Sequence, residues 1–353
     1  MANGVAIQLS GEYDVDLASA ATFVEVHEKV GEPTRFRFQL AVTIEDEDLP
    51  ALLDARLGPG AEVAVVVPVD GENHFLAKGL VHQQNILLRH SDTGSTLDVV
   101  GSDSSILMDR ELRAQVWPDV SASEAVESIV EQYGLTADVE TSPDRYLESK
   151  HALVQRDTDL RFIRQLARRY GYLFWLSADE EGVETAHFRR PPLDGDPAVT
   201  LRMNRPEPTI GSLNLGWDVE RATSAVCQQL DLTDKSDIEA DVPVSPLPPL
   251  GTDGLGAIHP APSTLQVIGP SDSAADLRTR GEAALIESGW FVRASTETSL
   301  TALGNVARAH TVAAVEGAGS RHSGRYFIHE VRHLIDDTSH IMELQMVRNG
   351  WGV

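Results

Sequence analysis

The residues best suited to chemistry are two histidines near the C-terminus. The segment His329-Glu-Val-Arg-His333 has the His-Glu-x-x-His spacing of zinc peptidases. That chemistry needs both imidazoles on one helical face, about 6 Å apart, so that they share one metal ion. Here Phe327, Val331 and Ile335 alternate with polar residues, which indicates a strand. Residues four apart on a strand lie about 13 Å apart, so we expect no zinc at this pair and interpret it as two histidines on one face of a strand.

The remaining candidate groups give no stronger signal. Histidines are dense near the C-terminus, which leaves adventitious metal binding or a pH response open; they are His322, His329, His333 and His340. Two acidic runs, Glu12 to Asp16 and Glu45 to Asp48, lack the glycine and spaced glutamate of a calcium loop. The single cysteine, Cys227, lies in an alternating run and is interpreted as a packed thiol. We therefore predict no catalytic, metal or cofactor-binding residue, and no cofactor.

Composition excludes several classes of protein. The 353 residues include 54 Asp and Glu against 29 Lys and Arg, for a formal net charge of -25. Such a chain repels phosphate backbones and anionic membrane surfaces, so we expect neither nucleic-acid binding nor membrane insertion. One thiol cannot form an internal disulfide. A solvated acidic surface, an acidic patch facing a basic partner and a salt-adapted host all remain open explanations of the charge.

The N-terminal sequence bears on localisation. Met1-Ala-Asn-Gly-Val-Ala6 has no basic stretch followed by an apolar core, so no signal peptide is predicted. No apolar run approaches the roughly 20 residues that span a bilayer. We expect the protein to be made and folded in the cytoplasm.

Periodicity predicts a β-rich α+β protein in three parts. Residues 1–102 read as an antiparallel meander with one short helix, consistent with a small barrel. Residues 103–208 read as an α/β insert, which ends in a Pro-rich linker from Pro191 to Pro208. Residues 209–353 return to strands and contain a long loop from 237 to 270. The expected strands of the first part are 35–44, 61–69, 74–82, 84–89 and 95–100, with a helix around 48–57.

The insert has the clearest helix signals. Ser121-Ala-Ser-Glu124 is a capping box, and the helix that follows closes at Gly134. A second helix starts near Asp157 or Thr158 and ends at Gly171. A third helix, from Ser273 to Ser288, is predicted in the last part, capped by Ser271 or Ser273. Strands are expected there at 290–300, 306–315, 326–335 and 341–347.

The second helix carries the only basic cluster in the sequence. Two interpretations remain open: a solvated helix face, or a contact with an acidic surface on a neighbouring subunit. The cluster consists of Arg156, Arg161, Arg164, Arg168 and Arg169.

The two ends of the chain share an order of elements. Each has strands, one helix and further strands, and Leu57-Gly58 and Leu303-Gly304 each precede a strand. The matching order predicts a duplicated barrel.

Four stretches, in order along the chain, resemble the hub domain of phage late-control protein D and VgrG proteins. The strongest is Arg156 to Leu176, with an acidic cap, a helix, a glycine and the aromatic strand Tyr172-Leu-Phe-Trp-Leu176. The other stretches are Val99 to Asp103 with Leu107, Trp117 and the helix to Leu135; the helix Ala274 to Glu287; and Ser323 to His333 followed by Ile341 to Arg348.

The resemblance implies a fold and a role. It implies two tube-like antiparallel β-barrel domains with an α/β insert between them, and a homotrimer that joins a sixfold tail tube to a threefold spike in the baseplate of a contractile phage tail or injection system. The partners implied are the tail tube or a tube-initiator protein, a spike protein and other baseplate proteins, and the barrel edge strands and residues 237–270 are expected at the interfaces. VgrG proteins usually continue into a spike, whereas this sequence stops at Val353, so the spike is expected to be a separate chain.

Two other functions remain open at this point. One is a metallopeptidase or cell-wall hydrolase that uses the His-rich C-terminal segment, which stoichiometric bound zinc would favour. The other is a free-standing carbohydrate- or protein-binding β module, which would expose an aromatic patch, although aromatic residues make up only 6% of the chain.

Overall fold

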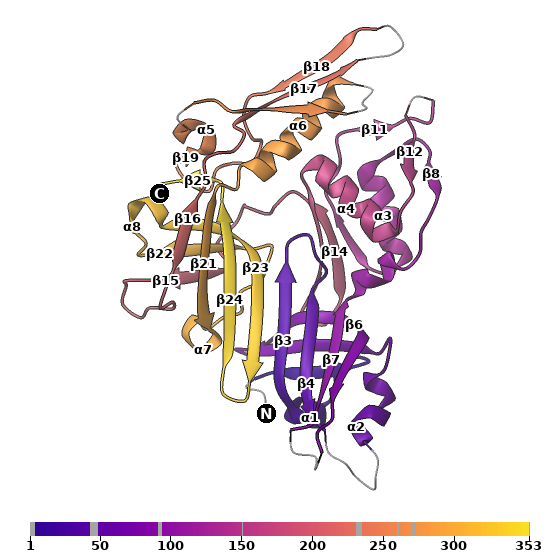
Figure 1. The fold of residues 1–353 in the computed structure, drawn as a ribbon, viewed down its shortest axis with the longest axis vertical. Coiled ribbons are helices and arrows are strands. Elements are labelled where there is room, and N and C mark those ends of the chain that lie inside the picture. Colours follow the sequence, from indigo (N-terminus) through magenta and orange to yellow (C-terminus); the bar gives the residue numbers. More distant parts are fainter. Residues whose placement is uncertain are drawn as a thin grey trace.

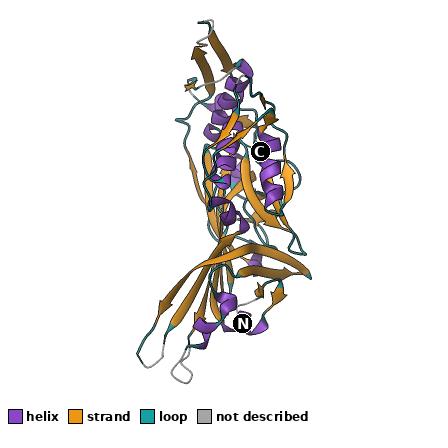
Figure 2. Ribbon diagram, turned by 90° about the vertical axis from the view of Figure 1, so that its right-hand side faces the viewer, coloured by secondary structure: helices purple, strands orange, loops and turns teal. Residues whose placement is uncertain are grey.

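The computed structural model describes residues 4–42, 49–90, 94–149, 151–230, 235–259, 261–269 and 273–352. It is a β-rich α+β fold built on one large sheet, which confirms the predicted fold class. Eight strands cross the molecule in the order β16-β21-β24-β23-β3-β4-β7-β6, and Figure 1 shows them side by side. Figure 2, a view from the side, shows most of the helical ribbon in the upper part of the molecule and mainly strands below.

The first part supplies one half of this sheet. Its apolar residues alternate along the strands and pack into a core that includes Phe36, Phe38, Val63, Val65 and Leu97. Its elements are β1 (Ala6–Leu9), β2 (Glu12–Tyr13), α1 (Val15–Ala20), β3 (Ala21–Lys29), β4 (Arg35–Ala41), α2 (Pro50–Leu53), the 3-10 turn η1 (Ala55–Leu57), β5 (Glu62–Val69), β6 (Glu72–Leu87) and β7 (Thr96–Asp103).

Two predictions in this half need correction. The strands expected at 74–82 and 84–89 are one 16-residue strand, β6, because a β-bulge between Val81 and Gln83 absorbs the break in periodicity. The helix expected around 48–57 is two short pieces, α2 and η1, since Asp54 has an extended backbone and caps the second piece. Residue 48 and the acidic run 45–48 lie outside the described residues.

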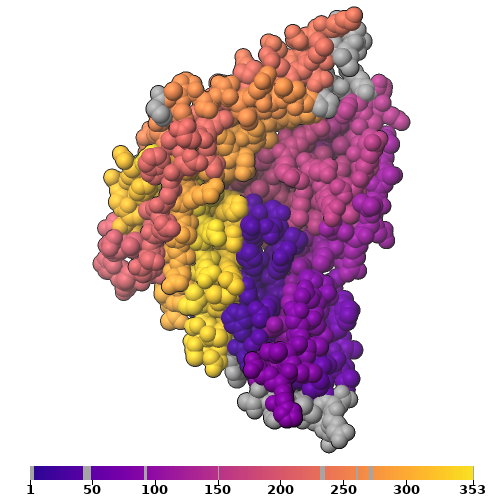
Figure 3. All heavy atoms as spheres, in the orientation of Figure 1, coloured from indigo at the N-terminus to yellow at the C-terminus, as the bar shows by residue number. Residues whose placement is uncertain are grey.

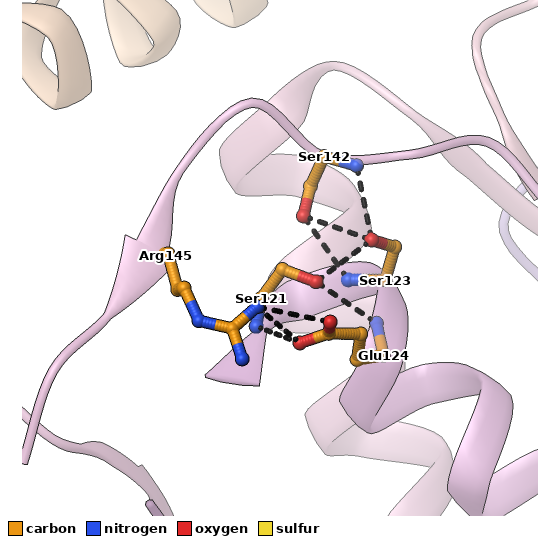
Figure 4. Close-up of polar contacts among 5 residues, drawn as sticks. All are labelled: Ser121, Ser123, Glu124, Ser142 and Arg145. Atoms are coloured by element: carbon orange, nitrogen blue, oxygen red, sulfur yellow. Dashed lines mark hydrogen bonds and ion pairs between the residues drawn. The ribbon is translucent and has the colours of Figure 1, made fainter. Parts of the chain in front are cut away.

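The insert confirms both predicted helices. Helix α3 (Ala122–Gln132) starts at Ser121, whose side chain and that of Glu124 cap each other's backbone N–H. Figure 4 shows this capping box, with Arg145 on Glu124 at 3.0 Å and the buried pair Ser123 and Ser142 exchanging backbone-to-hydroxyl bonds of 3.1 Å. Helix α4 (Asp159–Tyr170) is capped by Thr158 and ends at Gly171 with a left-handed φ of 67°. The other elements are the 3-10 turn η2 (Ser104–Asp109), β8 (Gln115–Trp117), β9 (Val120–Ser121), β10 (Thr136–Val139), β11 (Arg145–Tyr146), β12 (Leu153–Gln155), β13 (Leu173–Ala178) and β14 (Glu184–Arg189).

The last part, together with β15 at the end of residues 103–208, supplies the other half of the sheet and a small projecting sheet. Helix α6 (Ala274–Ser288) is confirmed, with Ser273 as its N-cap; Ser271 lies outside the described residues. Strands β17, β18 and β20 form the projecting sheet at the top of Figure 1. The elements are β15 (Val199–Arg202), β16 (Asn214–Trp217), β17 (Ser224–Leu230), β18 (Asp237–Val242), β19 (Asp253–Gly254), α5 (Leu255–Ile258), β20 (Thr264–Ile268), β21 (Val292–Ser299), α7 (Leu300–Leu303), β22 (Val312–Glu316), α8 (Gly319–His322), β23 (Gly324–Asp336), β24 (His340–Arg348) and β25 (Gly350–Trp351).

Three predictions fail here. Residues 237–270 are not one long loop, because β18 and β20 pair with β17 and their apolar residues pack against α6. The linker 191–208 contains β15, which pairs in parallel with β22. The strand expected at 306–315 is confined to β22, because residues 305–311 form a loop that reaches the other half of the molecule.

The two halves of the large sheet repeat one topology. The first has the order β3-β4-β7-β6-β5-β1, and the second has the order β16-β21-β24-β23-β22-β15. Each strand occupies the same place in chain order in both halves, and a short helix precedes β5 and β22 alike. The bulges also correspond, at His82 in β6 and at His329 in β23. One pair differs, since β1 is antiparallel to β5 whereas β15 is parallel to β22.

The halves join through their strands. Residues Glu330 to Asp336 of β23 pair with β3, so the two repeats form one continuous sheet. No helix among the described residues combines the length and the apolar character that crossing a membrane requires.

Candidate functional site

The two histidines of the zinc-peptidase spacing lie in different surroundings. Both are on strand β23, as the alternation predicts, but the bulge at His329 shifts the phase of the strand. His333 is therefore fully buried, whereas His329 is half-buried and lines a groove. The prediction that the two share one face is wrong for this reason. Among the described residues no three His, Cys, Asp or Glu side chains form a group that could hold a metal ion.

His333 belongs to a buried charged cluster that ties the halves together. Glu28 of β3 accepts bonds from Arg308 Nε at 2.6 Å and from the Ala309 backbone N–H at 3.0 Å. His333 Nε2 lies 3.6 Å from the same carboxylate. Arg308 also donates to the carbonyl oxygen of Phe75 in β6 at 2.7 Å. One carboxylate thus connects β3, β6, β23 and the loop 305–311.

The protonation states in this cluster follow from burial and charge. Burial raises the pKa of Glu28, but the Arg308 guanidinium and the His333 ring act in the other direction and hold the pKa below its ordinary value. Burial lowers the pKa of His333. Burial also lowers the pKa of His340, to about 3, and its Nε2 lies 3.0 Å from His333 Nδ1. The histidines are therefore neutral at neutral pH.

A third buried histidine, His310, joins the insert to the last part. The ring of His310 stacks on Trp175 of β13 at 4.4 Å between centroids and 4° between planes. His187 stacks on Trp175 at 4.5 Å. Burial lowers the pKa of His310 to about 3. This sandwich fixes the loop 305–311 against the insert.

A groove of about 1390 Å³ opens among the described residues. Figure 3 shows the indigo, magenta, orange and yellow segments that line it meeting on one face. Its walls carry eight basic side chains against three acidic ones, in a chain whose net charge is -25. The basic residues are Lys29, Arg161, Arg164, Arg168, Arg169, Arg221, Arg280 and Arg293, and the acidic residues are Asp157, Glu287 and Glu330.

Only part of the basic lining of this groove was predicted from the sequence. Four of the five arginines predicted as a cluster line it; Arg156 does not. Sequence reasoning missed the other cations because they come from β3, the loop between β16 and β17, α6 and β21, and no local pattern connects those segments. Within the described residues, no carboxylate forms an ion pair with Arg164, Arg168 or Arg293.

The groove has the composition of a protein interface. Its floor includes Trp290, Phe327 and Leu173, and arginine outnumbers lysine by seven to one. Arginine and aromatic residues are enriched, and lysine depleted, at the cores of protein interfaces. Small-molecule sites range from about 300 to 1,000 Å³, and this groove is larger. The arrangement suits an extended protein segment with acidic and apolar side chains.

Two strand edges are also exposed. Beyond its bulge, β6 pairs with β7 on one side, and no strand of the described chain pairs with residues 83–87 on the other. Strand β16 pairs with β21 alone among the described strands. Ile86, Leu87 and Trp217 on these edges are 47, 49 and 55% exposed. Exposed apolar edges are candidates for pairing with another chain.

The remaining predicted groups have structural roles. Asp14 caps α1 and forms an ion pair with Arg56 at 2.7 Å, and Glu12 and Asp16 surround it on the surface. Cys227 is fully buried beneath α6, where a Cβ at Gly281 would lie 2.7 Å from its sulfur. Burial raises the pKa of this thiol. The cysteine is a packing residue, as predicted.

Comparison with known proteins identifies both a family and a fold. A family model described as the Alg8 N-terminal domain matches residues 22–203, just over half of the chain. The 43 kDa tail protein of prophage MuSo2 from Shewanella oneidensis is similar over 98% of both chains, with a TM-score of 0.70 and 14% identity. A tail protein from Neisseria meningitidis covers 98% of this chain and 96% of its own, with a TM-score of 0.67 and 13% identity.

A third structure extends the likeness beyond phages. The c3393 protein of Escherichia coli is a component of the type VI secretion system, and it is described as similar to the T4 tail proteins gp27 and gp5. It covers 98% of this chain and 79% of its own, with a TM-score of 0.61 and 12% identity. No curated protein matches the sequence. At these identities the likeness shows a shared fold, and the chain has the fold of phage tail proteins.

Proposed function

We propose that this chain, which belongs to the Alg8 N-terminal domain family, is a structural hub subunit of a tail-like particle. Three copies form a ring that joins a sixfold tail tube to a threefold spike in the baseplate of a contractile phage tail or injection system. The chain acts through shape and interface complementarity, without catalysis. Its partners are further copies of itself, a tail tube or tube-initiator protein, a spike protein and other baseplate proteins.

The duplicated topology carries this proposal. Six strands recur in the same chain order and the same sheet order, with a bulge at the same place. One chain therefore presents two similar sheet units, and the three chains of the proposed ring present six. Such a ring offers a sixfold face to a tube and a threefold arrangement of whole chains to a spike.

The structural neighbours support the same role. The similar proteins from Shewanella and Neisseria are tail proteins, and the one from Escherichia coli is a type VI secretion component with structural similarity to T4 tail proteins. We propose a division into a first tube-like unit at 1–102, an insert at 103–208 and a second tube-like unit at 209–353, to which β15 at the end of the insert adds a strand. The cationic groove is the surface that we assign to an acidic segment of a neighbouring protein in the assembled baseplate.

Light scattering on the purified protein, followed by negative-stain imaging, tests the proposal. The expected result is a particle of about three times the chain mass of 38.4 kDa that appears as a six-lobed ring with a central hole. A chain that stays monomeric at high concentration, both alone and with its spike protein, would contradict the hub function.

A further inference from the structure

The internal repeat identifies the contact between copies. Within one chain, the repeats meet where β3 pairs with the part of β23 that follows the bulge. The counterpart of β3 in the second repeat is β16, and the counterpart of β23 in the first repeat is β6. Within the part of the chain that the structure describes, both counterparts have a free edge at the equivalent place: β16 on the side away from β21, and β6 at residues 83–87, after its bulge.

We infer that β16 of one copy pairs, antiparallel, with residues 83–87 of β6 in a second copy of this chain. The contact between chains then repeats the contact within the chain. The two edges lie on opposite sides of the eight-strand run in Figure 1, so the association is head-to-tail and closes into a ring when the rotation permits. This inference rests on the proposed function, which supplies the number of copies.

The register follows from the pairing scheme. In the first repeat, Val26 of β3 lies opposite Phe36 of β4, and Phe36 lies opposite Gly101 of β7. Gly101 in turn lies opposite Val81 of β6, the residue before the bulge at His82.

The second repeat gives the same path. Leu215 of β16 lies opposite Ala294 of β21, and Ala294 lies opposite Met346 of β24. Met346 in turn lies opposite Ile328 of β23, the residue before the bulge at His329. Leu215 therefore holds the place that Val26 holds in the first repeat.

The contact inside the chain then supplies the partner of Leu215. Val26 is opposite His333, which lies four residues after the bulge residue of β23. Four residues after the bulge residue of β6 stands Ile86. Leu215 of one copy is thus opposite Ile86 of the next, and Gly216 is opposite Asn85.

The side chains fit this register. Ile86 is 47% exposed in the single chain, and Leu215 is half-buried at the margin of its core. Pairing places these two aliphatic residues against each other on one face of the sheet, where cross-strand neighbours stabilise an antiparallel pair. An exposed apolar edge that stayed unpaired would be prone to nonspecific association.

A cysteine pair tests the contact and its register. The variant carries Asn85→Cys and Gly216→Cys. Directly opposite residues in antiparallel strands have Cα atoms about 4.5 to 5.5 Å apart, which is within the range of a disulfide. A Cβ at Gly216 meets no atom within 4 Å, so the cysteine fits there. The native Cys227 is fully buried, so it should form no competing disulfide. The matched control carries Asn85→Cys with Ser212→Cys, four residues out of register and about 13 Å away.

Mild oxidation and non-reducing electrophoresis give the readout. The expected result is covalent species of two and three chains and none larger from the in-register pair, with little product from the control. Equal products from both pairs would overturn the register. A ladder that continues past three chains would overturn the closed ring.

A second variant measures the same surface without cysteines. Ile86→Glu places a carboxylate on the paired edge and is expected to weaken the trimer by at least about tenfold in dissociation constant. Ile268→Glu is the control, because Ile268 is 72% exposed on β20 of the projecting sheet, which is separate from the large sheet that holds both edges. An intact trimer in Ile86→Glu, with no disulfide in the cysteine pair, would overturn this contact and leave the hub function standing. A wild-type monomer with no disulfide would overturn both.

Discussion

Glu28 and Arg308 form a buried ion pair across the boundary between the two repeats, with Arg308 Nε 2.6 Å from the Glu28 carboxylate. Glu28 is 4% exposed, and Arg308 also donates to the carbonyl oxygens of Phe75 and Leu76. The pair therefore fixes the loop 305–311 against strands of the other half. It holds the two units of the continuous sheet in one arrangement.

Breaking this pair is expected to cost much of the chain's stability. Glu28→Gln removes the negative charge and leaves the Arg308 guanidinium without a counter-charge, so the free energy of unfolding should fall by about 3 to 5 kcal/mol. Urea unfolding followed by tryptophan fluorescence measures the change. The matched control is Glu32→Gln, because Glu32 pairs with Lys29 at 2.7 Å on the surface and its loss should cost less than about 1 kcal/mol. Equal effects from the two variants would show that the buried pair does not hold the halves together.

Acid should weaken the fold through His310. Burial lowers the pKa of His310 to about 3, against about 6.5 in an unfolded chain, so the unfolded state binds more protons between these pH values. Stability is fully present above pH 6.5 and falls as the pH drops, by about 1.4 kcal/mol per unit, or about 2 kcal/mol between pH 6.5 and 5. Four groups act electrostatically on the His310 ring: Glu28, His187, His329 and Arg308. Among them, only the Glu28 carboxylate favours protonation of His310.

A variant isolates this contribution. His310→Phe keeps an aromatic ring on Trp175 and removes the titrating group. Urea midpoints measured from pH 8 to pH 5 should decline less steeply in the variant than in the wild-type protein. Parallel pH profiles would mean that His310 does not contribute to the acid sensitivity, and would leave His333 and His340 as its source.

The sequence predicts local features well and long-range ones poorly. The capping box at Ser121, the start of α4 near Thr158 and its end at Gly171 follow from patterns a few residues long, and the structure confirms each of them. The ion pair of Glu28 with Arg308 joins residues 280 positions apart, and no local period encodes it.

Strand bulges explain other errors. A bulge adds one residue and inverts the alternation that follows, which is why His329 and His333 looked like one face and why β6 looked like two strands. Residues 237–270 looked like a loop because proline and glycine interrupt short strands whose stability comes from packing on α6.

The end of α4 offers a test of packing between the insert and α6. Gly171→Ala forces an alanine into a left-handed φ of 67° and brings its Cβ within 2.6 Å of Ile286 Cδ1 and 3.1 Å of Ala283 Cα. The combined strain and crowding should lower the free energy of unfolding by about 3 kcal/mol. Gly134→Ala is the control, since it has a similar φ of 72° and meets no atom within 4 Å, and should cost only about 1 kcal/mol. Thermal unfolding of both variants measures the difference, and equal losses would show that α4 and α6 are not closely packed there.

The cationic groove makes a prediction about stability and function together. Arg168 and Arg293 are exposed, and no carboxylate of the described chain forms an ion pair with either. Replacing both with alanine should therefore change the free energy of unfolding by no more than about 0.5 kcal/mol. By contrast, Arg169 donates to Asp276 at 2.6 Å, and Arg169→Ala should destabilise the chain by more than that because it leaves a buried carboxylate with fewer partners. Urea unfolding of the three proteins checks the order. If the double variant of Arg168 and Arg293 lost as much free energy of unfolding as Arg169→Ala, these groove arginines would serve to stabilise the fold. The expected order instead leaves the positive charge of the groove available to an acidic neighbour in the assembled baseplate.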